Sequence, residues 1–132
     1  MEIQLSSERV IPPADVLRLY SVAAWWPART ESEVEKVVVG GRAAGAWDGE
    51  RLIGFARFVT DGRFRAYIED VIVDPAHRNK GVATALVQRL LDALSEIDVV
   101  SLFCDETSAG VYERSGFSRT RQVVMHYKAR RR

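Results

Sequence analysis

The sequence has almost no cysteine, no excess of either charge and no long apolar run. Its one cysteine, Cys104, excludes an intrachain disulfide and gives no sign of an oxidising compartment. There are 19 basic and 18 acidic side chains, and this balance favours neither nucleic acid nor a membrane as a partner. The apolar runs are too short to cross a bilayer, and the N-terminus lacks the features of a signal peptide. We therefore expect a cytoplasmic protein.

What is present is the composition of a globular domain. Hydrophobic residues make up 47% of the 132 positions, which is enough to build one core without cross-links. No repeat, low-complexity tract or linker divides the chain, so we expect a single domain over residues 1–132. The basic end of the chain, residues 128–132, is interpreted as a solubilising terminus.

Periodicity and turn residues predict an alternating series of elements. Pro12-Pro13 favours a helix start, residues 30–33 (TESE) match a capping box, and two Asp-Gly pairs indicate hairpin turns. In chain order we expect a strand over residues 2–5, helices from 14 to near 26 and from 31 to about 39, strands over 42–47, 51–60 and 65–73, a helix over 81–96, a strand over 99–104, a short helix over 108–114 and a last strand over 118–127.

This order predicts an α/β (α+β) fold. The strand, helix and strand between residues 65 and 104 form a crossover, which joins parallel neighbours with right-handed connection. The three strands linked by tight turns form an antiparallel meander. We expect a mixed, mostly antiparallel sheet with helices on both faces, and ligands near the C-terminal ends of its strands.

A basic turn containing a glycine follows the strand that ends at Val73. The first amides of a helix have no intrahelical partner, and the helix dipole adds positive charge there. Gly81 and Ala83 keep this backbone accessible, while Arg78 and Lys80 add full charges. Neither a Walker nor a G-x-G-x-x-G spacing is present. From the residues alone, the turn is either a pyrophosphate site or a solvated glycine turn.

Two motifs resemble those of the GNAT superfamily of N-acetyltransferases. Residues 71–83, VIVDPAHRNKGVA, match the family's acetyl-CoA motif V-x-P-x-x-R/Q-x-x-G-x-G/A. Residues 111–117, VYERSGF, resemble its second signature, a tyrosine followed by a Gly-Phe pair. The predicted order of elements is similar to the family fold over nearly the whole chain. The resemblance implies acetyl-CoA as co-substrate and no metal.

The resemblance also implies which residues hold acetyl-CoA. In the family, two core strands splay apart to admit the pantetheine arm, and here these are residues 69–73 and 99–104. The amides of residues 78–84 would meet the pyrophosphate. Asp105 stands where many relatives carry an asparagine, which puts in doubt the pantetheine contact made by that amide. The implied set is Val71, Ile72, Val73, Arg78, Asn79, Lys80, Gly81, Val82, Ala83, Thr84 and Asp105.

Tyr112 and Glu69 are the catalytic candidates. Tyr112 resembles the family tyrosine that protonates the departing thiolate, a role that suits a phenol; packing is the alternative. Glu69 resembles the glutamate that activates the amine, and an exposed strand edge is the alternative. Asp70, its neighbour, points to the other face unless a bulge intervenes, and it either binds the acceptor or anchors a loop. Cys104 ends a predicted buried strand and is expected in the core, so direct transfer is favoured over an acyl-cysteine.

The acceptor is left open by the sequence. The family builds its acceptor pocket from the first two helices and later strands, which makes Trp26, Arg29, Tyr67 and Asp70 the candidates here. The tryptophan pair Trp25-Trp26 either lines this pocket or fills the core. We expect transfer of acetyl to a primary amine of a small molecule. A peptide amine is the alternative acceptor, and a non-catalytic acyl-CoA-binding module is the alternative function. A homodimer also stays open.

Overall fold

The computed structural model describes residues 1–129 of the chain. Its helices and strands follow the predicted order as far as residue 114. They are β1 (Glu2–Leu5), α1 (Pro13–Val22), α2 (Glu31–Val38), β2 (Ala43–Asp48), β3 (Arg51–Thr60), β4 (Arg65–Val73), α3 (Val82–Ala93), β5 (Val99–Leu102) and α4 (Ala109–Arg114).

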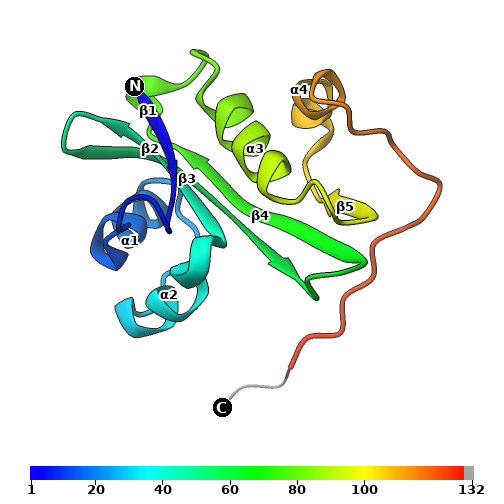
Figure 1. The fold of residues 1–132 in the computed structure, drawn as a ribbon, viewed down its shortest axis with the longest axis horizontal. Helices are drawn as coiled ribbons and strands as arrows, with labels where there is room; N and C mark the ends of the chain where they lie inside the picture. The colour runs from blue at the N-terminus through cyan, green and yellow to red at the C-terminus, as the bar shows by residue number, and fades with distance from the viewer. Residues whose placement is uncertain (130–132) are drawn as a thin grey trace.

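The five strands form one sheet in the order β1-β2-β3-β4-β5 (Figure 1). Strands β1 to β4 pair antiparallel with their neighbours, and β4 pairs with β5 in parallel. The parallel pair is connected through α3, so the crossover predicted between residues 65 and 104 is confirmed.

Helices cover both faces of this sheet, as predicted (Figure 1). On one face α3 buries an apolar stripe that includes Val82, Leu86 and Leu90. On the other face α1 and α2 bury side chains such as Leu19 and Val34 against β2 to β4. Within each helix the buried residues recur three or four positions apart, which is the spacing that places them on one side of the helix. In the described part of the chain, every helix falls short of the length and apolarity that crossing a membrane requires.

The capping box predicted before α2 is present. The Glu33 amide donates to the Thr30 hydroxyl oxygen at 3.3 Å, and the Thr30 amide donates to the Glu33 carboxylate at 2.9 Å. These bonds satisfy two groups that a helix start would otherwise leave unpaired, and so they determine where α2 begins.

The predicted last strand over residues 118–127 is wrong. This segment leaves α4, loops outward and returns without strand pairing (Figure 1), and the His126 ring meets the Phe103 ring edge-on with centroids 6.1 Å apart. Val123, Met125 and Tyr127, which share one side of the predicted strand, are 80%, 87% and 98% exposed. Alternating polarity specifies which face a strand would bury, but a strand also needs a hydrogen-bonded neighbour. The basic terminus is described only to residue 129; residues 130–132 lie outside the described part.

Two predicted boundaries also move. Helix α1 ends at Val22 instead of near residue 26, because Ala24 and Trp26 adopt left-handed backbone angles, with φ of 58° and 48°. Strand β5 ends at Leu102 instead of residue 104, and Cys104 is exposed. The prediction that Cys104 lies in the core is therefore wrong, because the strand stops before it.

Candidate active site

A bulge in β4 determines the geometry of the site. Arg57 on β3 pairs with Glu69, whereas Phe55 pairs with Ile72, so β4 carries one more residue than β3 over this interval. Asp70 lies in the bulge with a φ of 57°, a left-handed conformation that is uncommon for a residue other than glycine. Without the bulge, Glu69 and Asp70 would face opposite sides of the sheet. With it, both carboxylates reach the Arg57 guanidinium.

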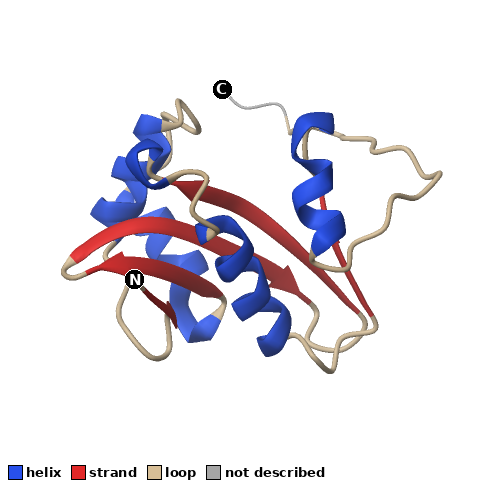
Figure 2. Ribbon diagram, turned by 90° about the horizontal axis from the view of Figure 1, so that it is seen from above, coloured by secondary structure: helices blue, strands red, loops and turns tan. Residues whose placement is uncertain are grey.

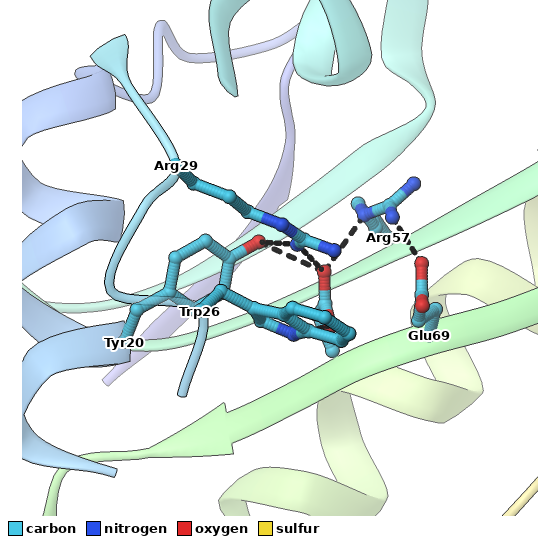
Figure 3. Close-up of polar contacts among 6 residues, drawn as sticks. Tyr20, Trp26, Arg29, Arg57 and Glu69 are labelled. Carbon is cyan, nitrogen blue, oxygen red and sulfur yellow. Dashed lines mark hydrogen bonds and ion pairs between the residues drawn. The ribbon is translucent and has the colours of Figure 1, made fainter. Parts of the chain in front are cut away.

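Asp70 is the centre of a buried polar network, and Figure 3 labels four of its members: Tyr20, Trp26, Arg29 and Arg57. Its carboxylate accepts hydrogen bonds from Arg57 Nε at 2.9 Å, Arg29 Nη1 at 2.9 Å and the Tyr20 hydroxyl at 2.8 Å. A longer bond of 3.3 Å comes from the Trp26 indole N–H. The carboxylate thus joins α1, the α1–α2 loop (residues 23–30), β3 and β4.

The network also determines the protonation states of its members. Burial by itself would raise the pKa of Asp70, but hydrogen bonds from Arg57 and Tyr20 and the charges of Arg57 and Arg29 lower it. Burial, followed by the charge of Asp70, raises the pKa of Tyr20. Asp70 is therefore a carboxylate and Tyr20 a neutral phenol at neutral pH. Of the two roles left open for Asp70, this geometry favours anchoring the α1–α2 loop.

Glu69 remains accessible beside this network. Its carboxylate forms an ion pair with Arg57, yet 22% of its side chain is exposed, compared with 3% for Asp70. Burial by itself would lower the pKa of Arg57, but its bond to Asp70 and the charge of Glu69 raise it, so the guanidinium stays charged. Arg57 therefore holds both carboxylates, one buried and one open to a cavity.

Strands β4 and β5 separate at this level of the sheet. Their pairing runs from Arg65 and Val99 to Ile68 and Leu102 and stops there. Figure 2 shows the two strands close together at one end and diverging toward the other. The edge of β4 over residues 69–73 is consequently left without a β5 partner. Such an edge offers amide and carbonyl groups to an extended ligand.

Two cavities open where the strands diverge. The first, which we name the acidic cavity, has a volume of about 700 Å³ and is lined by Glu69, Asp70 and Asp105 together with several aromatic side chains. The second, the basic cavity, has a volume of about 570 Å³ and is lined by His77, Arg78 and Arg114. Trp25, Val71, Ser108 and Tyr112 line both, so the two cavities are adjacent.

The basic cavity contains most of the residues implied to hold acetyl-CoA. Its lining includes Val71, Ile72, Val73, Arg78, Asn79, Gly81, Val82, Ala83 and Thr84. Lys80 is exposed and does not line it, and Asp105 lines the acidic cavity instead. The Ile72 side chain packs mainly in the core under α1, and that of Val82 packs under α3. These two residues therefore present main chain more than side chain to the cavity.

The start of α3 is shaped to accept an anion. The first intrahelical hydrogen bond runs from the Ala85 amide to the Gly81 carbonyl at 3.0 Å, so the amides of Val82, Ala83 and Thr84 precede it. Gly81 has a φ of 79°, which suits glycine, and a Cβ placed on it would meet no atom within 4 Å. The accessible backbone, the free amides and the Arg78 charge fit a pyrophosphate.

Tyr112 lies at the junction of the two cavities. Its ring meets Phe117 edge-on with centroids 6.2 Å apart, which connects the tyrosine of the second motif to the Gly-Phe pair. Burial, followed by the charge of Cys104, raises the pKa of Tyr112, so the phenol keeps its proton at neutral pH. Ser108 lines the same junction, and its position one helical turn before Tyr112 is a signal from which the sequence could have identified it.

The predicted acceptor residues separate into two groups. Trp26, Tyr67 and Asp70 line the acidic cavity, with Trp26 48% exposed. Arg29 lines neither cavity; its guanidinium lies 4.1 Å from the centre of the Trp26 ring and binds Asp70. Tyr20, whose role the sequence did not predict, donates its hydroxyl hydrogen bond to Asp70. Its helical spacing predicts only burial, and nothing local indicates a carboxylate partner.

The open edge of β4 thus lies beside the start of α3, with Tyr112 between the two cavities. The Acetyltransferase (GNAT) family model matches residues 11–117, and the chain belongs to this family. An acetyltransferase of the GNAT family from Streptococcus pneumoniae superposes with a TM-score of 0.77 and is 25% identical, with 98% of this chain and 97% of that chain covered.

Two curated plant relatives match over 70 residues, or 52% of this chain. GCN5-related N-acetyltransferase 2, chloroplastic, of Arabidopsis thaliana is 42% identical over this region, and the histone acetyltransferase TAP1 of Glycine max is 39% identical. The matched region covers 27% and 30% of the length of these two relatives.

Proposed function

We propose that this domain transfers the acetyl group of acetyl-CoA to a primary amine of a small molecule, by direct attack in a ternary complex. One observation carries the proposal: a carboxylate, Glu69, and a protonated phenol, Tyr112, line the same cavity beside the open edge of β4. Acetyl transfer to an amine needs one group to take a proton and another to give one.

The basic cavity supplies the binding site for the donor. The open edge of β4 pairs with the extended pantetheine arm, and the start of α3 with Arg78 binds the pyrophosphate. Acetyl-CoA supplies an activated acetyl thioester. The direction from α3 to Tyr112 leads the thioester end toward the acidic cavity, because Tyr112 lines both cavities.

Glu69 acts on the attacking nitrogen. An ammonium group must lose a proton before its nitrogen can form the new bond to carbon, and Glu69 takes this proton directly or through a water molecule. Arg57 fixes the position of the Glu69 carboxylate and is in turn fixed by Asp70. Arg57 and Asp70 are thus positioning residues, and Glu69 is the base.

Tyr112 acts on the leaving sulfur. As the N–C bond forms and the C–S bond breaks, the phenol gives its proton to the thiolate. The nitrogen loses two protons in all: Glu69 takes the first before the attack, and the second leaves after the N–C bond has formed and replaces the proton that Tyr112 gave to sulfur. Glu69 passes its proton to solvent, so one proton is released per turnover. The raised pKa of Tyr112 keeps the proton available over the neutral pH range.

A thiol-release assay with purified protein, acetyl-CoA and a panel of amines tests the proposal. We expect turnover with at least one small primary amine, and the Glu69→Gln variant should reduce kcat by about 10²- to 10⁴-fold while CoA affinity by calorimetry changes little. CoA binding without turnover of any amine would instead indicate a non-catalytic module.

A protein amine is the second candidate acceptor, and one observation favours it. A relative that shares the matched region is named a histone acetyltransferase. Including a lysine-containing histone-tail peptide in the panel distinguishes the two, since the small-molecule proposal predicts the higher kcat/KM for a small amine.

A further inference from the structure

The chemistry of the acidic cavity indicates which amines it accepts, provided that the proposed transferase function holds. Among the described residues that line this cavity, none is lysine, arginine or histidine. The neighbouring Arg29 and Arg57 are engaged by Asp70 and Glu69. A phosphate or carboxylate on the acceptor would therefore find no cation in the lining, and it would face Glu69 and Asp105 instead. His126 packs edge-on against Phe103 from outside this lining.

Aromatic side chains form most of the remaining wall. Trp25, Trp26 and Phe103 line the cavity while being 41%, 48% and 52% exposed. The Tyr67 ring packs beside Phe103 with centroids 4.8 Å apart and an angle of 39° between the ring planes. Large aromatic surfaces gathered around one concavity are typical of a binding site, because leaving them in water forfeits the free energy of burial.

The position of Trp26 is fixed before any ligand arrives. Its indole N–H binds Asp70, and the Arg29 guanidinium stacks on its ring at 4.1 Å (Figure 3). A ring held in this way loses little conformational entropy when a ligand packs against it, so its contact contributes more to affinity.

We infer that the acceptor is a small arylalkylamine, a single primary ammonium joined to an aromatic ring by a short alkyl chain. The ammonium meets the Glu69 carboxylate, which is also the proposed base. The ring lies among Trp26, Tyr67 and Phe103, where aromatic pairing adds to simple burial. A polyamine has no ring to bury among these side chains, and an aminosugar phosphate would place its anion beside carboxylates.

Competing acceptors in the same assay test this inference. With phenethylamine, n-hexylamine, spermidine, glucosamine 6-phosphate and a histone-tail peptide, we expect phenethylamine to have a kcat/KM about tenfold or more above the others, as expected for aromatic contacts worth about one factor of ten. A higher kcat/KM for hexylamine, spermidine, the sugar phosphate or the peptide would overturn it.

A matched pair of variants tests the aromatic wall itself. Phe103→Leu should lower the ratio of kcat/KM for phenethylamine to that for hexylamine by about three- to tenfold, mainly through KM. Phe64→Leu changes a phenylalanine that is similarly exposed, at 57%, but lines neither cavity, and it should leave the ratio unchanged. An unaltered ratio in Phe103→Leu would contradict the inference.

Binding without turnover separates failure of this inference from failure of the proposed function. Phenethylamine should change the tryptophan fluorescence of the CoA-bound wild type at lower concentration than hexylamine does. If it does so and no amine is acetylated, the proposed function fails while the site for an arylalkylamine stands. If amines are acetylated without preference for the aromatic one, only the arylalkylamine inference fails.

Discussion

The two cavities that meet at Tyr112 are opposite in charge. The basic cavity is lined by backbone amides and by His77, Arg78 and Arg114, and its described lining contains no carboxylate. The acidic cavity is lined by Glu69, Asp105 and aromatic rings, and its described lining contains no cation. The contrast assigns an anionic ligand to one cavity and a cationic one to the other. Under the proposed function, the phosphates of the donor and the ammonium of the acceptor would lie on separate sides of the tyrosine.

The two cavities also differ in how they are built. The basic cavity depends largely on one continuous segment, residues 71–84, and on the start of α3. The acidic cavity depends on a bulge in β4 and on contacts to Asp70 from residues 13, 41, 44 and 50 positions away. We therefore expect damage to the first to act on ligand binding alone, and damage to the second to act on stability as well.

Gly81→Glu should have the largest effect on ligand binding, because it places a negative charge in the lining of the basic cavity. We expect CoA affinity to fall by at least about 100-fold, or roughly 2.7 kcal/mol, in calorimetry. Gly62→Glu is the matched control: Gly62 has the same φ of 79° and a Cβ there also meets nothing within 4 Å, but it lines neither cavity. Normal CoA binding by the Gly81 variant would refute the assignment of the start of α3 as the pyrophosphate site.

Asp70→Asn should disrupt the hydrogen bonds and ion pairs that hold the walls of the acidic cavity together. Replacing the carboxylate removes one of the two countercharges of the buried Arg57 guanidinium, while Glu69 remains. We expect a cost of about 3 kcal/mol in the free energy of unfolding, the lower end of the range for breaking a buried ion pair. Urea denaturation measures this cost. Asp98→Asn changes an exposed aspartate and should stay within about 0.5 kcal/mol of the wild type. A comparably small loss at Asp70 would mean that the network does not hold the loop.

The pH dependence of stability sharpens this prediction. Because the pKa of Asp70 is lowered from its ordinary value of 3.8, the carboxylate contributes stability that is fully present above pH 3.8 and is lost as the pH falls through its folded value. The stability difference between wild type and Asp70→Asn should therefore be constant from neutral pH down to about pH 5 and shrink below pH 4. A difference that grows on acidification would contradict the lowered pKa.

Cys104→Ser should have the smallest effect. Cys104 is exposed and lines the acidic cavity, so its position would permit an acyl-cysteine, but direct transfer does not use it. We expect kcat to stay within about twofold of the wild type, since neither protonation role involves the thiol. Mass spectrometry of the wild type after mixing with acetyl-CoA alone should detect no acetylated Cys104. An acetyl-enzyme that an amine then consumes would replace direct attack with a two-step route.

The difference between the cavities also explains what could be predicted from the sequence. The turn over residues 74–81, the crossover and the apolar faces of α1 and α3 are encoded by neighbouring residues, and each was predictable. The bulge was foreseen only as an alternative, because nothing local to Glu69-Asp70 specifies how many residues of β4 oppose Ala56 on β3. The segment 118–127 has the alternation of a strand, but alternation contains no information about whether a partner is in reach.

The site residues can also be divided into those that neighbouring residues predict and those that depend on distant contacts. Arg78 and Gly81 could be assigned from spacing and chemistry, whereas the roles of Tyr20 and Arg57 could not, since each depends on a carboxylate distant in the chain. Left-handed backbone at Ala24 and Trp26, which ends α1 early and brings Trp26 to the cavity, also has no clear signal in the residue types.

The rate of thiol release by Tyr112→Phe tests the central claim most directly. This claim is that the Tyr112 hydroxyl protonates the leaving thiolate where the donor and acceptor cavities meet. The variant keeps the ring that packs against Phe117 and removes only the hydroxyl. With the best amine of the panel, kcat should fall by about 10²- to 10⁴-fold while the CoA dissociation constant stays within about twofold. An unchanged kcat would contradict the account, because the junction would then contribute packing and no chemistry.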